Sequence, residues 1–436
     1  MTLNKRTLTN SLLTAGLGVF AFVGGSTAAI AQDGAPAKGP VATLESPAMP
    51  RIYWGQTSRF TNSFNPAFGL ALDGSIRHSD EEDGYSVGLD LAEITTQGPL
   101  APDWWGNLVI ETNSDEVALT ESAIYYTGLG ERSALRGGRF FVDFGKQMQQ
   151  HVHDMAMPNR PAVLREYLGY ELAGEGIQFD HWSPISDETA VRFSVGLFGE
   201  MGAHDHSGEG HGDHDDHDDH GGEEHGEVEM HIEDYRDIAD MTLTARATAM
   251  TNVGSTGVLQ VGASLKTIPD FAYEAEGEDA LGGELDLEEE GLDQSITGWD
   301  ITYGWANEDG SKGWNIGAEF IRAEGALGAE LEHDELNGLD DVLAVIDGSA
   351  QGYFAFVEHD LDGENEIGVM VSTFEHLEES DVEETETSLY WNHWANEYTR
   401  VRLAAVHREN DEGVDSQAIV VQLTGYVGAH GHPYNW

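Results

Sequence analysis

Histidine and acidic residues are concentrated in residues 201–240. This stretch holds eight of the chain's nineteen histidines, with fifteen aspartates or glutamates and one arginine. Near neutral pH an imidazole is largely uncharged and can bind Zn²⁺, Ni²⁺ or Cu²⁺, whereas carboxylates alone favour Ca²⁺ or Mg²⁺. H-x-H and H-x₂-H spacings on a flexible chain predict several weak, exchanging metal sites; the alternative is an acidic surface loop whose histidines have no role. The candidate ligands are His204, His206, His211, His214, His217, His220, His225 and His231.

A second cluster lies in residues 149–169, where His151, His153 and Asp154 are close together in the sequence. On an extended chain His151 and His153 point to the same side, because side chains alternate along a strand. The three residues are therefore predicted to begin a metal site. An equally open alternative is that the histidines anchor a loop by hydrogen bonds.

The N-terminus predicts export. Lys5 and Arg6 precede an apolar run, and the small residues that follow end at Ala31, so residues 1–31 are expected to be a signal peptide. Residues 32–65 are polar, contain prolines and show no period, which is typical of a periplasmic segment. The chain has no cysteine, so no disulfide framework holds the fold. Its formal net charge of −58 argues against nucleic acid as a partner.

From residue 66 to residue 436 the sequence alternates between apolar and polar residues in short segments. In residues 297–306, Trp299, Ile301 and Tyr303 fall on one face and Asp300 on the other. Period two predicts strands with two different environments. Sixteen such segments are expected, starting near residues 67, 85, 104, 117, 135, 175, 189, 241, 255, 297, 312, 350, 364, 385, 398 and 416.

The connections between these segments alternate in length. Residues 306–311, 360–363 and 395–397 are short connections, while 267–296 and 323–349 are long. An even number of strands, short turns at one end and long loops at the other indicate a single transmembrane antiparallel up-and-down β-barrel in the bacterial outer membrane. Aromatic residues near strand ends favour the barrel over a soluble β-sandwich or propeller.

With both termini in the periplasm, residues 143–174 become the third external loop and 201–240 the fourth. In porins the third loop commonly folds inward, so Arg165 and Glu166 are predicted to line a constriction. Long acidic connections, among them 270–296 and 376–386, surround the external mouth and concentrate cations there. The predicted pore-wall residues, on the polar faces of their strands, are Arg192, Arg246, Arg400 and Arg402.

Two stretches resemble a family of bacterial outer-membrane barrels often labelled zinc-regulated TonB-dependent outer membrane receptors, which are porin-like in predicted fold. They are FNPAFGLALDG at 64–74 and, within 138–181, GRFFVDFGKQMQQHVHD, RPAVLREYLG and GEGIQFDHW. The chain departs from the family at residues 154–160. The matching positions of the second stretch are Gly138, Arg139, Phe140, Phe141, Asp143, Gly145, His151, His153, Pro161, Arg165, Leu168, Gly169, Gly176 and Gln178.

Members of that family often carry a His/Asp-rich insertion where this chain has residues 204–231, so the resemblance implies zinc or another divalent metal as substrate. The resemblance covers the first half of the barrel well and the second half mainly by pattern. A TonB-dependent receptor also has a plug domain before its 22-stranded barrel. Residues 32–65 are too few to form one, so the porin-like part of the label is the part that the sequence supports physically.

The sequence as a whole predicts an outer-membrane channel that takes up zinc or a related divalent metal, captured by residues 201–240, with His151 and His153 receiving the ion. No motif indicates an enzyme, and no cofactor is expected beyond Zn²⁺, Ni²⁺ or Cu²⁺ as the bound or transported ion. The expected partners are membrane lipid, the outer-membrane barrel assembly machinery and, by analogy, two further copies in a homotrimer. Two alternatives stay open: a porin for anions or small solutes, and a surface barrel that buffers metal without transporting it.

Overall fold

The computed structural model describes residues 67–81, 84–113, 117–130, 132–203, 228–232, 236–278, 284–308, 310–332, 341–378, 382–411 and 413–428. Almost all of them form strands. In chain order the elements are β1 (Ala67–Ser79), β2 (Gly84–Ala101), β3 (Trp104–Thr112), β4 (Val117–Tyr126), β5 (Ser133–Phe141), η2 (Val152–Asp154), α2 (Ala162–Leu168), β6 (Leu172–Pro184), β7 (Thr189–Ala203), β8 (Val228–His231), η3 (Ile238–Asp240), β9 (Thr242–Val253), β10 (Gly257–Glu278), β11 (Glu284–Ala306), β12 (Gly313–Glu332), β13 (Val342–Asp360), β14 (Asn365–Glu375), β15 (Glu383–Asn396), β16 (Thr399–Asn410) and β17 (Asp415–Gly428).

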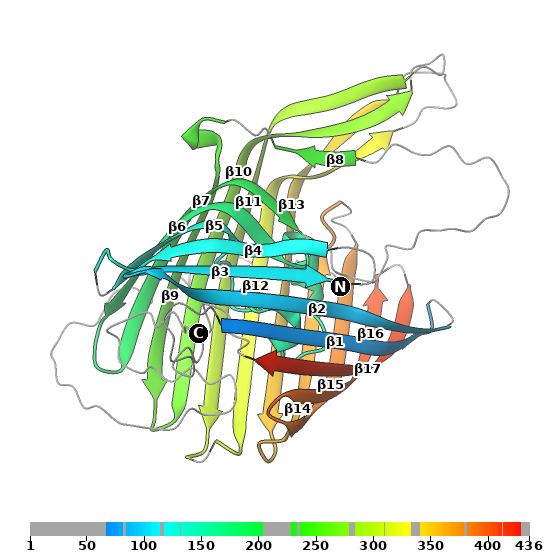
Figure 1. The fold of residues 1–436 in the computed structure, drawn as a ribbon. Helices are drawn as coiled ribbons and strands as arrows, with labels where there is room; N and C mark the ends of the chain where they lie inside the picture. The colour runs from blue at the N-terminus through cyan, green and yellow to red at the C-terminus, as the bar shows by residue number, and fades with distance from the viewer. Residues whose placement is uncertain are drawn as a thin grey trace, which may run out of the picture.

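The strands form a closed antiparallel barrel of 16 strands (Figure 1). Each strand pairs with its neighbour in the sequence, except that β7 pairs with β9, and β17 closes the ring by pairing with β1. The short β8 lies outside this ring and pairs with the far part of β10. The predicted fold class and the predicted sixteen strands are therefore confirmed.

The barrel wall has its polar face inside and its apolar face outside. On β7, Arg192 and Ser194 are 6% and 3% exposed, whereas Phe193 and Val195, which alternate with them, are each 47% exposed. A soluble β-sandwich packs its apolar faces together and presents its polar faces to water. Polar side chains inside and apolar side chains outside, as observed here, are the arrangement of a barrel whose outer surface contacts lipid. The alternative of a soluble β-sandwich or propeller is therefore wrong.

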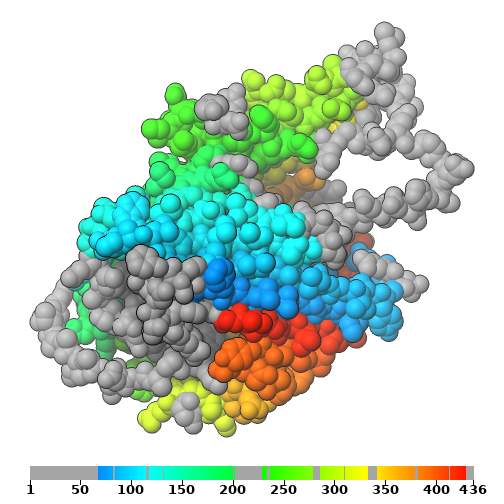
Figure 2. Space-filling view, viewed as in Figure 1, coloured from blue at the N-terminus to red at the C-terminus, as the bar shows by residue number. Residues whose placement is uncertain are grey.

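Two predicted loops are wrong, because residues 267–296 and 323–349 are largely strand. They extend β10, β11, β12 and β13 beyond the barrel wall, and the yellow-green extension of β10 and β11 is visible in Figures 1 and 2. The extension has an apolar cluster of its own, which includes Phe271, Tyr273 and Leu343. The high density of acidic residues obscures the period-two alternation in this part of the sequence.

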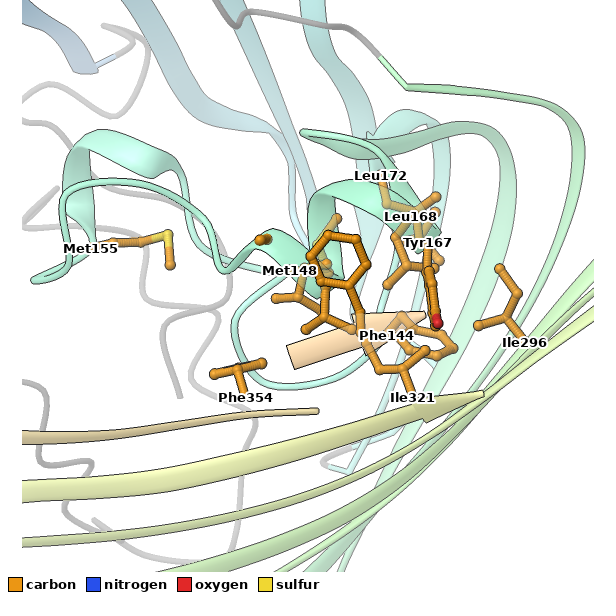
Figure 3. Packing of buried hydrophobic residues seen from close by; sticks show 14 of the residues in the cluster. Phe144, Met148, Met155, Tyr167, Leu168, Leu172, Ile296, Ile321 and Phe354 are labelled. Atoms are coloured by element: carbon orange, nitrogen blue, oxygen red, sulfur yellow. The ribbon is translucent and has the colours of Figure 1, made fainter. Parts of the chain in front are cut away.

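Residues 142–171, which connect β5 to β6, are called the internal segment here. They contain η2 and α2, and many of their apolar side chains are fully buried. Figure 3 shows Phe144, Met148 and Tyr167 of this segment packed against Ile321 and Phe354 of the wall. The prediction that this loop folds inward is confirmed. None of the helices among the described residues is long and apolar enough to cross a membrane.

Candidate metal centre

The internal segment is attached to strands on nearly every side of the barrel. Asp143 accepts a hydrogen bond from Ser194 on β7, and the amide of Gly145 donates to Ser264 on β10 at 3.0 Å. Further along, the amide of Val163 donates to Ser372 on β14 at 3.0 Å. A segment that contacts inward-facing side chains of widely separated strands must cross the barrel interior.

The turn at Gly145 shows how the segment enters the interior. Its φ of 57° lies in the left-handed region, which only glycine adopts without strain. Directly after it, the amides of Lys146 and Gln147 both donate to Oε1 of Glu319 on β12, at 2.8 and 2.9 Å. Glycine allows the backbone to lie against this carboxylate.

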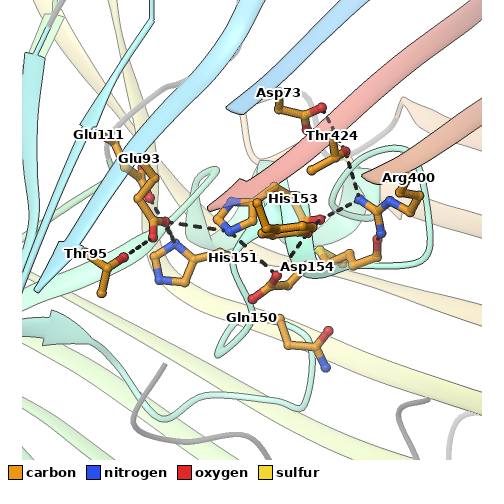
Figure 4. A network of polar contacts seen from close by, with 12 residues as sticks. Asp73, Glu93, Thr95, Glu111, Gln150, His151, His153, Asp154, Arg400 and Thr424 are labelled. Carbon is orange, nitrogen blue, oxygen red and sulfur yellow. Dashed lines mark hydrogen bonds and ion pairs between the residues drawn. The ribbon is translucent and has the colours of Figure 1, made fainter. Parts of the chain in front are cut away.

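His151 lies at a cross-strand pair of glutamates. Glu93 on β2 and Glu111 on β3 are directly opposite each other in the strand register, and both side chains are buried. Nδ1 of His151 is 3.0 Å from Oε2 of Glu93 and 2.9 Å from Oε1 of Glu111. Figure 4 shows the imidazole of His151 beside these two carboxylates. Like charges directly opposite on a sheet repel each other, so the imidazole lies where positive charge is needed.

His153 and Asp154 continue this cluster. Nε2 of His153 is 3.8 Å from Oε2 of Glu93 and 3.6 Å from Oδ1 of Asp154. The backbone carbonyl of His153 accepts hydrogen bonds from Arg400 and from the hydroxyl of Tyr426, the latter at 2.9 Å. These contacts fix the direction of the imidazole by fixing the backbone that carries it (Figure 4).

The two imidazoles have opposite pKa shifts. Burial lowers the pKa of His151, but the charge of Glu93 and hydrogen bonds with Glu111 and Glu121 outweigh burial and raise it well above its usual value. Burial lowers the pKa of His153 to about 4, against the weaker opposing effect of Asp154. His153 is therefore neutral near pH 7, with a nitrogen lone pair that can bind a metal.

Two sets of three donors lie close enough to hold one ion. Glu93, His151 and His153 form the first set, and Glu111, His151 and Glu171 form the second; within each set the donor atoms are within 4.8 Å of one another and the residues are buried. The sequence indicated the histidines but not the three glutamates. For Glu93 and Glu111 the only available signal was an acidic residue on the inward face of each of two consecutive strands.

The four arginines predicted to form the pore wall do face the interior, but they are engaged by other groups. Arg192 is 2.9 Å from Asp143 and 2.7 Å from Asp180, and Arg246 is 2.6 Å from Asp300. Arg400 and Arg402 both donate to the backbone carbonyl of Met155. Two of these guanidinium groups are balanced by carboxylates, and the other two hold the internal segment in place.

The predicted constriction residues lie on α2. Nη2 of Arg165 is 2.6 Å from Oε2 of Glu386 on β15, and Oε1 of Glu166 accepts a hydrogen bond from the amide of Leu377 at 2.9 Å. Both side chains thus attach α2 to the wall near β14 and β15. Whether they limit the pore stays a prediction.

Of the eight histidines in residues 201–240, only His231 lies within the described residues. It is on β8, is exposed, and has Nδ1 3.7 Å from Oε1 of Glu274. The predictions for residues 1–31 and 32–65 also concern residues outside the described part of the chain. The histidines outside the described residues are His204, His206, His211, His214, His217, His220 and His225.

Comparisons with known proteins agree with this architecture. A loop L8 deletion mutant of OmpT, an outer membrane protein of Vibrio cholerae, is similar with a TM-score of 0.52 at 10% identity, over 84% of this chain and 100% of that one. OmpT of Vibrio cholerae expressed in the outer membrane has a TM-score of 0.50 at 9% identity, over 84% and 99% of the two chains. The fold is that of an outer-membrane β-barrel.

No family model and no curated protein sequence matches the chain. The comparisons thus support the barrel and give no support to the zinc-regulated receptor label. A closed barrel that presents apolar side chains outward satisfies its backbone hydrogen bonds within the wall, as a protein in lipid must. The protein is a β-barrel of the bacterial outer membrane.

Proposed function

We propose that this protein is a porin-like channel for uptake of zinc or a related divalent metal ion. The observation that supports the proposal is the position of His151 between Glu93 and Glu111, in the interior that a passing solute must cross. Imidazole with carboxylate is a donor set that suits divalent transition-metal ions. In this proposal residues 201–240 capture the ion outside the cell and release it, because their binding is weak.

The test is ion selectivity of the purified full-length chain in a planar bilayer, measured as the reversal potential in a zinc chloride gradient. We expect the reversal potential to have the sign of a channel that is more permeable to Zn²⁺ than to chloride. A preference for the anion would overturn the proposal in favour of the anion porin. The engaged arginines of the wall give the anion alternative little support.

A second test addresses residues 204–231 in cells. Replacing them with a glycine and serine stretch of equal length should slow growth only when zinc is limited by a chelator, because capture matters only when the ion is scarce. The matched control is the same pair of strains without chelator. Equal growth of variant and parent under chelation would count against a capturing role.

The second candidate function is a barrel that binds metal without transporting it. The observation that favours it is the filling of the interior by the internal segment, whose Phe144, Met148 and Leu164 are fully buried. Figure 3 shows the first two of these side chains. A barrel filled in this way conducts less than one with an open lumen. Absence of any single-channel conductance in the bilayer experiment would select this candidate. Assembly into a homotrimer stays a prediction under either function.

A further inference from the structure

The donors around His151 come from two parts of the molecule. Glu93 and Glu111 belong to β2 and β3 of the barrel wall, while His151 and His153 belong to the internal segment. At this point the two imidazoles contact the glutamates of the wall. An ion bound by a glutamate of the wall together with the two histidines of the internal segment would therefore join the segment to the wall.

The distances suit a small divalent ion. Ligand atoms at about 2.0–2.2 Å from a tetrahedral zinc ion lie roughly 3.3–3.6 Å from each other. Here Nδ1 of His151 is 3.0 Å from Glu93, and Nε2 of His153 is 3.8 Å from the same carboxylate. The donor atoms of all three residues lie within 4.8 Å of one another, so an adjustment of these side chains would bring them to that geometry.

The charges around the donors also favour a cation. Five carboxylates face this cluster, together with the imidazole of His151 and the guanidinium groups of Arg160 and Arg400. Carboxylates gathered in a place from which water is largely excluded are costly unless cations balance them. The five carboxylates are those of Glu93, Glu111, Glu121, Asp154 and Glu171.

The groups around the donors hold them in place. The hydroxyl of Thr95 donates to Oε1 of Glu93 at 2.5 Å, and Asn107 donates to Oε2 of Glu121. Arg400, shown in Figure 4, and Tyr426 both donate hydrogen bonds to the carbonyl of His153. Partners of this kind orient metal ligands and reduce the entropy lost on binding.

We propose that Glu93, His151 and His153 bind one divalent first-row transition-metal ion that stays resident and fixes the internal segment to the wall formed by β2 and β3. Two imidazoles with a carboxylate favour ions of the zinc class over Ca²⁺ and Mg²⁺, which take oxygen ligands. This inference rests on the proposed function in so far as the channel delivers the ion. It goes beyond the proposed function because the ion stays at these fully buried donors and has a structural role, whereas uptake requires only that ions pass them.

The experiment uses the full-length chain in detergent and in lipid vesicles, with zinc and cobalt as probes. We expect Zn²⁺ to raise the unfolding temperature of the parent, and Co²⁺ to give the absorption of a site with nitrogen ligands. In both His151→Gln and His153→Gln the metal affinity of this site should fall at least roughly 100-fold, since even outer partners of a metal site are worth 10 to 100-fold. The same measurement is repeated with both variants made in a chain that lacks residues 204–231, so that metal binding by that stretch does not contribute.

The matched control is His407→Gln, because His407 also lies near two carboxylates, those of Asp415 and Glu409, but on an exposed part of β16. It should leave the zinc effect unchanged. Retention of the zinc effect in His151→Gln and His153→Gln, with both variants folded as judged by their unfolding transition without metal, would overturn the resident site.

Zinc flux into the same vesicles separates this inference from the proposed function. Flux without the zinc-dependent rise in unfolding temperature would overturn the resident site and leave the uptake channel standing. The rise without flux would do the reverse: it would support the resident site in a barrel that does not transport zinc.

Discussion

At the scale of single residues, His151 and His153 differ in chemistry although they are two residues apart and equally buried. Burial alone would make both imidazoles neutral. Only His151 has two carboxylates at about 3 Å, and its pKa is raised, whereas that of His153 is lowered to about 4. Without a bound ion the imidazole of His151 carries the proton that balances the two glutamates and must release it to bind a metal, whereas His153 offers a lone pair directly.

Gly145 gives a residue-scale prediction. Its φ is 57°, and a Cβ atom added there would lie 2.2 Å from Oε2 of Glu319. Gly145→Ala should therefore lower the free energy of unfolding by about 1–3 kcal/mol. It should also increase conductance fluctuations, because the internal segment loses its hydrogen bonds with Glu319 on β12. Denaturant titration and bilayer recording would measure the two effects.

The control for Gly145 is Gly425→Ala on β17, where no atom lies within 4 Å of the added Cβ and φ is not in the left-handed region. Its unfolding free energy should stay close to that of the parent. An equal loss of stability in both variants would contradict a specific role for Gly145.

At this scale the sequence predicted part of the candidate centre. His151, His153 and Asp154 could be recognised because histidines two apart next to an acid are a local pattern. Glu93 and Glu111 were missed because neither belongs to a local cluster of metal-binding residue types in its strand. Their meeting depends on the register between β2 and β3, which no short stretch of sequence encodes.

At the scale of elements, the internal segment decides what the inward arginines do. On the strand pattern alone, Arg400 and Arg402 are pore-wall charges. In the fold both donate to the carbonyl of Met155, so they organise the segment that crosses the interior. A planar guanidinium suits this task because it presents several donors in fixed directions.

The contact between α2 and the wall predicts a pH dependence. The ring nitrogens of His376 are 3.4 Å from Glu166 on α2 and 3.5 Å from Glu384 on β15. Hydrogen bonds to these two carboxylates raise the pKa of His376 to about 10, against the opposing effect of burial. Because the pKa is above the unfolded value of 6.5, the contact stabilises the fold fully below pH 6.5 and is lost as pH rises through about 10.

His376→Gln should thus lower the unfolding free energy near pH 6 by up to about 1 kcal/mol, since the side chain is partly exposed and screened by water. Above pH 10 the variant and the parent should unfold alike. Glu166→Gln should reproduce part of the loss, and the double variant should show less than the sum of the two. A difference that is the same at both pH values would refute the assignment.

At the scale of the whole molecule, the apolar outer surface of the barrel predicts the free-energy cost of placing a charged side chain on it. Leu389 lies near the middle of β15 and is 62% exposed on the outer face. Leu389→Arg should cost about 2–4 kcal/mol in folding into lipid vesicles, as expected for a cation at the bilayer midplane. The denaturant dependence of folding in vesicles measures this cost.

The matched control is Leu361→Arg, in the turn after β13, where the side chain is 38% exposed. At the membrane surface the expected cost is about 0–1 kcal/mol. Equally small costs at both positions would be the result for a protein surrounded by water and would contradict the lipid-facing surface.

The amino-acid pattern was enough to predict the sixteen strands, most of their starting points, and the two faces of the strands with clear alternation, such as residues 297–306. These are local properties, because period two is set by neighbouring residues. Only the tertiary structure decided that β10 to β13 extend beyond the barrel, that the inward arginines are engaged, and that Glu93 and Glu111 meet His151. The physical reason is that strand register and the path of the internal segment depend on contacts between residues far apart in the chain, whose energies no short stretch contains.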